Sequence, residues 1–78
     1  MSRGNIRVTT DMIRAARELL RWRQEELALR AGIAVSTLRL WEGKPGVLAA
    51  PTETRARIIA ALQGAGIEFL EDGVRLVR

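Results

Sequence analysis

The sequence predicts a mainly α domain of four short helices followed by a C-terminal β-hairpin. Apolar residues recur three and four positions apart through residues 10–65, as they do on the buried face of an amphipathic helix. Gly32 and the Gly-Lys-Pro-Gly break at 43–46 divide that stretch. The pattern then changes to alternation around Asp72-Gly73, which is a strong hairpin signal. With 78 residues, the chain forms one domain.

The first expected helix covers about residues 10–21 and follows an N-terminal arm, residues 1–8. Thr9 is the expected N-cap, because its hydroxyl can accept from a free amide of the first turn. Asp11 lies in that turn, where a negative charge suits the helix dipole. The apolar positions at helical spacing are Ile13, Ala16, Leu19 and Leu20.

Two shorter helices are expected over residues 24–31 and 35–42, with a tight turn between them. Gly32 can end the first of them by adopting a left-handed conformation. The small side chain of Ala28 lets the two helices approach, and Ile33 fills the angle between them. The expected buried positions are Leu27, Ala28, Leu38 and Trp41, with Trp22 also toward the core.

A fourth helix is expected over about residues 53–65, with Thr52 as its cap and Gly66 after its end. Its apolar face carries Ile58, Ile59 and Leu62.

The hairpin is expected to turn at Asp72-Gly73, which places Phe69 opposite Leu76 and Leu70 opposite Arg75. Side chains alternate between the two faces of a strand. One face then carries Ile67, Phe69, Val74 and Leu76, and the other carries Leu70 and Val77.

Composition excludes several kinds of chemistry. The chain has no cysteine and no histidine, so disulfides, thiolate zinc sites and the commonest general base are absent. We expect no enzyme activity, no metal and no cofactor. No apolar run approaches the roughly 18 residues of a membrane span or resembles a signal peptide, which predicts a soluble, cytoplasmic protein that does not bind membranes.

Charge favours a polyanionic partner for the first part of the chain. The sequence has 13 basic and 9 acidic residues, a net charge of +4. Residues 1–48 contain nine basic and five acidic residues, whereas residues 49–78 contain four of each. The positive excess therefore lies in the first part, as expected of a nucleic-acid-binding surface.

The stretch from Ile13 to Glu42 resembles the phage repressor/Cro-like (Xre) family of helix-turn-helix DNA-binding proteins. With the fourth helix, the resemblance covers most of residues 9–66. It implies a sequence-specific regulator of transcription that binds double-stranded DNA, and a small bacterial or phage repressor or autoregulator in particular. The residues that carry the resemblance are Arg17, Gln24, Glu25, Glu26, Leu27, Ala28, Gly32, Ser36, Thr37, Leu38 and Glu42.

The resemblance also implies roles for individual residues. The helix over 35–42 corresponds to the recognition helix, which places its N-terminal residues at base edges in the major groove. Arg17 and Glu42 match a buried ion pair. Arg23 and Ala34 depart from the family, which usually has Ser or Thr there. The expected DNA-contacting residues are Arg23, Gln24, Ala34, Val35, Ser36, Thr37, Arg39, Leu40 and Lys44.

Residues 67–78 are expected to form a dimerisation element. Two recognition helices about 34–36 Å apart would reach successive major grooves at an inverted-repeat operator. The expected interface residues are Phe69, Leu70, Val74, Leu76 and Val77.

Three alternatives remain open from the residues alone. The hairpin can simply cap the fourth helix. Arg3 and Arg7 of the arm can reach a minor groove or can pack on the domain. The apolar Val35 and Leu40 on the expected reading face suit a protein-interaction module, similar to an antiactivator, that binds another regulatory protein without specific DNA binding.

Overall fold

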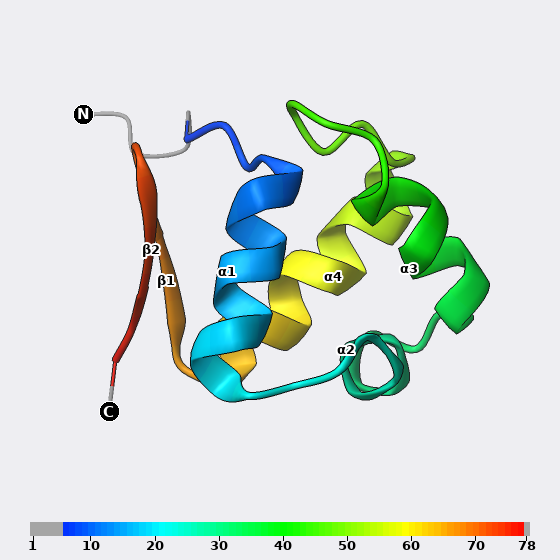
Figure 1. The fold of residues 1–78 in the computed structure, drawn as a ribbon, viewed down its shortest axis with the longest axis horizontal. Coiled ribbons are helices and arrows are strands. Elements are labelled where there is room, and N and C mark those ends of the chain that lie inside the picture. The colour runs from blue at the N-terminus through cyan, green and yellow to red at the C-terminus, as the bar shows by residue number, and fades with distance from the viewer. Residues whose placement is uncertain (1–5, 78) are drawn as a thin grey trace.

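The computed structural model describes residues 6–77, and it confirms a mainly α domain with a C-terminal hairpin (Figure 1). Arg3 lies outside the described residues. Among the described helices, none combines the length and apolarity needed to cross a membrane. The elements are α1 (Thr10–Leu20), α2 (Gln24–Ala31), α3 (Val35–Glu42), α4 (Thr52–Gly64), β1 (Ile67–Leu70) and β2 (Gly73–Leu76).

Helix α1 begins as the sequence predicts and ends one residue earlier. The Thr9 hydroxyl accepts a hydrogen bond from the Met12 amide at 3.2 Å. Arg21 is not part of the helix, because it adopts a left-handed conformation with φ of 59° and closes α1. The Trp22 amide then donates to the Arg17 carbonyl at 2.9 Å, which satisfies one of the last carbonyls of the helix.

Helix α4 begins at Thr52, so the prediction that Thr52 is its N-cap is wrong. Pro51 occupies the cap position, and no side chain caps the helix. The Pro51 carbonyl accepts from the Arg55 amide at 2.9 Å, which makes Thr52 the first helical residue.

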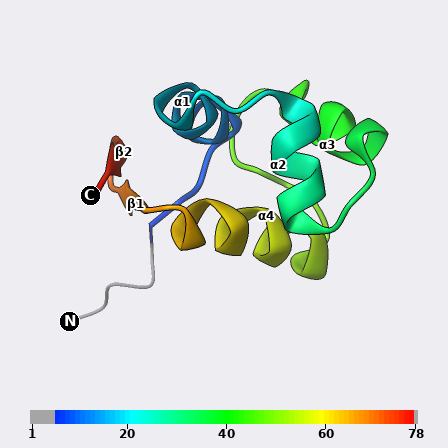
Figure 2. The same ribbon diagram turned by 90° about the horizontal axis from the view of Figure 1, so that it is seen from below.

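The core lies among the four helices, where α2 packs on α3 and α4 and α1 packs on α3, with the inner face of the hairpin beside α1 and α4 (Figure 2). Leu19 is 43% exposed, which corrects its expected place on the buried face. Trp22 and Trp41 are half-buried at the edge of the core. The buried apolar residues are Val8, Met12, Ile13, Ala16, Leu27, Ala28, Ala31, Leu38, Leu48, Ala50, Ile58, Leu62, Ile67 and Phe69.

The segment before α1 is held against the loop that follows α3. The Val8 carbonyl accepts from the Leu48 amide at 2.8 Å, and the Thr10 amide donates to the Gly46 carbonyl at 2.9 Å. Val8 is buried beneath this contact. The loop after α3 is therefore fixed to the start of α1.

The hairpin has a different register from the predicted one. Leu70 lies opposite Gly73 and Phe69 lies opposite Val74, so the turn residues are Glu71 and Asp72. This register places Glu68 directly opposite Arg75, and the two side chains form an ion pair. An opposite-charge pair across the strands stabilises the hairpin. The expected inner face is unchanged, because the register differs by an even number of residues.

Gly66 provides a test of how the hairpin joins α4. Its φ of 105° disfavours other residues, and an added Cβ would lie 2.8 Å from the Val77 carbonyl oxygen. We expect Gly66→Ala to lower the free energy of unfolding by about 1–3 kcal/mol. The matched control is Gly64→Ala at the end of α4, where an added Cβ meets nothing within 4 Å. The control should raise stability by up to about 1 kcal/mol. Equal urea denaturation midpoints for the two variants would contradict this hairpin geometry.

Candidate nucleic-acid interface

The turn between α2 and α3 sets the angle at which α3 is presented. Gly32 has a φ of 73°, and the Ile33 amide donates to the Ala28 carbonyl at 3.0 Å. Ala28 is buried, so the two helices cross closely. Helix α3 consequently lies at one end of the molecule, at the right of Figure 1, with one side open to solvent.

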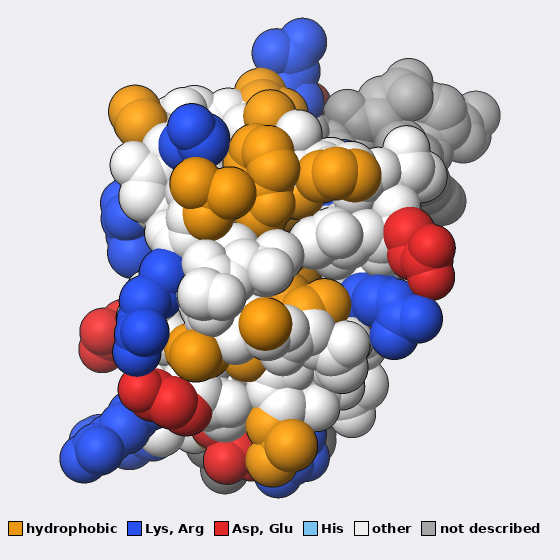
Figure 3. All heavy atoms as spheres, turned by 90° about the vertical axis from the view of Figure 1, so that its right-hand side faces the viewer, with side chains coloured by type: hydrophobic (Ala, Val, Ile, Leu, Met, Phe, Trp, Pro, Cys, Tyr) orange, Lys and Arg blue, Asp and Glu red, His pale blue; other side chains and the backbone are white. Residues whose placement is uncertain are grey.

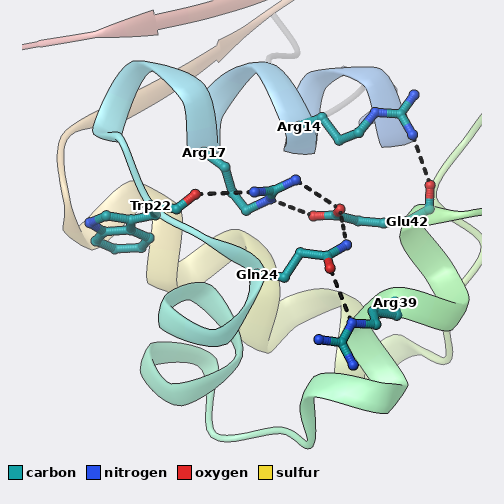
Figure 4. Close-up of polar contacts among 6 residues, drawn as sticks. All are labelled: Arg14, Arg17, Trp22, Gln24, Arg39 and Glu42. Atoms are coloured by element: carbon teal, nitrogen blue, oxygen red, sulfur yellow. Dashed lines mark hydrogen bonds and ion pairs between the residues drawn. The ribbon is translucent and has the colours of Figure 1, made fainter.

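A buried ion pair joins the end of α3 to α1 (Figure 4). Arg17 Nε donates to Glu42 Oε2 at 2.8 Å, and Arg17 Nη2 donates to Glu42 Oε1 at 3.1 Å. The Glu42 side chain is 3% exposed. Arg17 also donates to the Trp22 carbonyl at 3.1 Å. One guanidinium therefore ties α3 both to α1 and to the corner before α2.

Gln24, the first residue of α2, extends this contact toward the surface. Its Nε2 donates to Glu42 Oε1 at 2.8 Å, and its Oε1 accepts from Arg39 Nε at 3.2 Å. Both ends of the side chain are thus occupied within the protein. One N–H of Nε2 has no partner among residues 6–77, so a phosphate contact at this position can come from that donor or from the backbone amides at the start of α2.

Arg39 lies on α3 with one edge of its guanidinium held and the other free. Besides the bond from Nε to Gln24, its Nη2 donates to Glu25 Oε2 at 3.0 Å. A guanidinium has five N–H donors, so these two bonds leave donors on both Nη1 and Nη2. That outer edge has the two-pronged geometry that reads the O6 and N7 atoms of guanine.

The other side chains expected to contact DNA differ in how far they are exposed to solvent. Ala34, Ser36 and Leu40 are exposed, whereas Val35 and Thr37 are half-buried. Val35 also packs against the core, which limits its reach toward a groove. Apolar side chains gather in the upper part of the face that Figure 3 shows, and both basic and acidic side chains lie at its edges.

Cations flank this face beside the start of α2 and after α3. Arg23 is exposed at the N-cap of α2. Lys44 follows α3, and its Nζ lies 5.8 Å from the centre of the Trp41 ring. Gln24 follows Arg23 and contacts Glu42, the last residue of α3. Arg23 and Lys44 therefore lie on the side of the molecule where α3 ends. The structure thus brings Arg23, Gln24, Arg39 and Lys44 together around α3.

Sequence reasoning missed the two contacts of Gln24 with Glu42 and Arg39, and it missed two further contacts of this site. Glu25 holds Arg39, and Arg14 donates to the Glu42 carbonyl at 3.1 Å. The partners are 14 and 28 positions apart. Helical periodicity relates residues within one helix and carries no signal about such pairs.

Comparison with known proteins identifies the same helices. A family model described as helix-turn-helix matches residues 13–64, which is more than half of the chain and extends from α1 to the end of α4. No curated protein and no solved structure gives a significant match.

Removing either partner of the buried ion pair should strongly destabilise the protein. Arg17→Met and Glu42→Gln each leave a buried partner without its ion, and each should cost about 3–5 kcal/mol of unfolding free energy. The double variant should lose less than the sum, because the second change removes a group that is already unpaired. The control Glu53→Gln breaks an exposed pair with Arg57, which should be worth at most about 1 kcal/mol. Thermal denaturation tests this cycle, and strictly additive losses would contradict it.

Proposed function

This chain belongs to the Xre/Cro-like helix-turn-helix family of DNA-binding regulators, and on that premise we propose that it is a small repressor or autoregulator that binds an inverted-repeat operator as a homodimer. Such a protein acts by occupying the operator and excluding RNA polymerase. Helix α3 is its recognition helix, inserted into the major groove.

The held guanidinium of Arg39 is the observation that carries this proposal. A free arginine side chain loses rotamer freedom when it binds, and contacts made in advance reduce that loss. Gln24 and Glu25 bind one edge of the Arg39 guanidinium, and the side chain is 53% exposed. This arrangement suits a reader of guanine.

Two further side chains of α3 suit base contacts of other kinds. The hydroxyl of Ser36 is exposed and can donate to or accept from several bases. Leu40 is 52% exposed and can contact a thymine methyl group. We expect an operator half-site that combines a guanine with neighbouring thymines.

The hairpin supports the homodimer proposal through its outward face. Among residues 6–77 the sheet has only β1 and β2, so each strand has one edge without a partner strand. Val77 is 52% exposed, and Leu70 is half-buried on the outward side. Phe69 is buried in the core of the same chain, so in the proposed dimer it would lie under the interface and would not contact the partner directly. Val74 and Leu76 are half-buried and also pack on the core.

A protein-interaction module is the second candidate, and the apolar surface beside α3 favours it. Leu40 and Val47 are 52% and 44% exposed, and Trp41 is only half-buried. A gel shift with the DNA upstream of the protein's own gene, at two salt concentrations, separates the repressor from the protein-interaction module. DNA binding that weakens steeply with salt supports the repressor, because bound phosphates release counterions.

Arg39 should be required for sequence preference and not for folding. After binding-site selection from random duplex DNA, Arg39→Ala should weaken binding to the selected site by about 1–3 kcal/mol and relax the preference at one base pair per half-site. Its melting temperature should change little, because the side chain is exposed. The control is Arg55→Ala on α4, which removes one positive charge from a hollow beside β1. This variant should bind the selected site with wild-type affinity. An Arg39→Ala variant with wild-type affinity and preference would remove Arg39 from the site.

The dimer should depend on the outward face of the hairpin. Leu70→Lys combined with Val77→Lys places charges on that face, and we expect a monomer that binds the operator much more weakly. Deleting the hairpin is a poorer test, because it would also remove Ile67 and Phe69 from the core. Lys substitution at Leu29, which is 75% exposed on α2, is the control for added charge. Sedimentation at tens of micromolar measures the outcome, and a monomeric wild-type chain would overturn the homodimer.

A further inference from the structure

A carboxylate of α2 lies against the arginine of α3 that is the proposed reader. Glu25 Oε2 accepts a hydrogen bond from Arg39 Nη2 at 3.0 Å, and the two groups form an ion pair between the helices. The Arg39 and Glu25 side chains are 53% and 63% exposed. A negative charge beside a DNA-binding surface opposes the approach of phosphates. Glu25 therefore lowers the attraction of this face for DNA of any sequence.

The internal contacts of Arg39 occupy one side of its guanidinium. Nε donates to Gln24 Oε1 at 3.2 Å (Figure 4), and Nη2 donates to Glu25. The donors of Nη1 and the second donor of Nη2 have no partner among residues 6–77. Guanine presents O6 and N7 side by side in the major groove, and two parallel N–H groups can reach both atoms. Arg39 can therefore bind guanine while it keeps Gln24 and Glu25.

A phosphate contact places a different demand on Arg39. Phosphate oxygens are the acceptors that DNA of every sequence offers. The guanidinium is attached to the protein along one side, so it must leave Glu25 to follow a phosphate that lies in another direction. An exposed ion pair of this kind stabilises its arrangement by up to about fivefold. Non-specific binding through Arg39 is therefore weakened by the loss of the pair, whereas binding to guanine is not.

The adjacent carboxylate of α2 has a different partner. Glu26 Oε2 accepts a hydrogen bond from Arg30 Nε at 2.7 Å, and both residues belong to α2. Two neighbouring acids thus each pair with one arginine, and of these two only Glu25 pairs with α3. The chain therefore contains a built-in comparison for the effect of the Glu25 charge.

We propose that Glu25 is a specificity-determining residue, which positions Arg39 for guanine and disfavours its use as a phosphate contact. This inference rests on the proposed function. Specificity is the difference between the affinities for the correct and the incorrect site. Glu25 acts through Arg39 and increases that difference by weakening binding to incorrect sites.

The experiment measures Kd of full-length wild type and Glu25→Gln for two duplexes of equal length. One duplex carries the site obtained by binding-site selection, and the other carries a scrambled sequence. Fluorescence anisotropy gives both values at one fixed salt concentration, because both depend on salt. Glu25→Gln removes the charge and keeps the size of the side chain. It should bind the scrambled duplex about two- to fivefold more tightly and gain less at the selected site, so the ratio of the two Kd values falls.

Glu26→Gln is the matched control, because it removes one carboxylate from the adjacent position and releases one arginine, Arg30. It should shift both Kd values by the same factor and leave their ratio unchanged. A second control introduces Glu25→Gln into the Arg39→Ala variant. The ratio should no longer respond there, because the residue through which Glu25 acts is absent.

The outcomes separate this inference from the proposed function. Glu25 is not a specificity determinant if Glu25→Gln keeps the wild-type ratio, if Glu26→Gln lowers the ratio equally, or if the effect persists without Arg39. The proposed function stands in all three cases. If wild type prefers no sequence after selection and binds the DNA upstream of its own gene no better than the scrambled duplex, the proposed function fails and this inference fails with it.

Discussion

The position of α3 depends on the ion pair between Arg17 and Glu42. A charge buried as deeply as Glu42 is costly unless it is paired and hydrogen-bonded. Arg17 supplies two hydrogen bonds to the carboxylate, and Gln24 supplies a third. Because the three residues come from α1, α2 and α3, satisfying one carboxylate fixes the relative placement of all three helices. Such a pair adds less to net stability than to specificity of geometry, since desolvation offsets much of the attraction.

The same contacts continue outward to the proposed reader. Gln24 receives Arg39 on the side opposite Glu42, and Glu25 binds the same guanidinium. The orientation of Arg39 is thereby coupled to the core through a single side chain. This differs from a surface arginine on an isolated helix, whose long side chain samples many rotamers.

Local signals predicted most of the fold, and long-range pairing explains the errors. The ends of α2 and α3 follow from Gly32 and from apolar spacing, and the start of α1 follows from Thr9. The predicted register of the hairpin was wrong. It rested on the Asp-Gly turn signal, which is local, whereas the observed register pairs Glu68 with Arg75 across the two strands. At the site, the sequence indicated which helix faces outward. It did not reveal that Gln24 is occupied by two partners, because those partners are adjacent only after the helices pack.

The distance between α3 and the hairpin constrains any dimer built on the outward strands. The two elements lie at opposite ends of the molecule, whose longest dimension is 36 Å (Figure 1). Two chains joined end to end would hold their recognition helices about 70 Å apart, close to two turns of DNA. Two chains whose long axes meet at about 60° would hold them about 36 Å apart, which is one turn. In the proposed dimer, the twist of the paired hairpins would therefore set the spacing of the two half-sites, although the hairpins themselves would lie far from the bases.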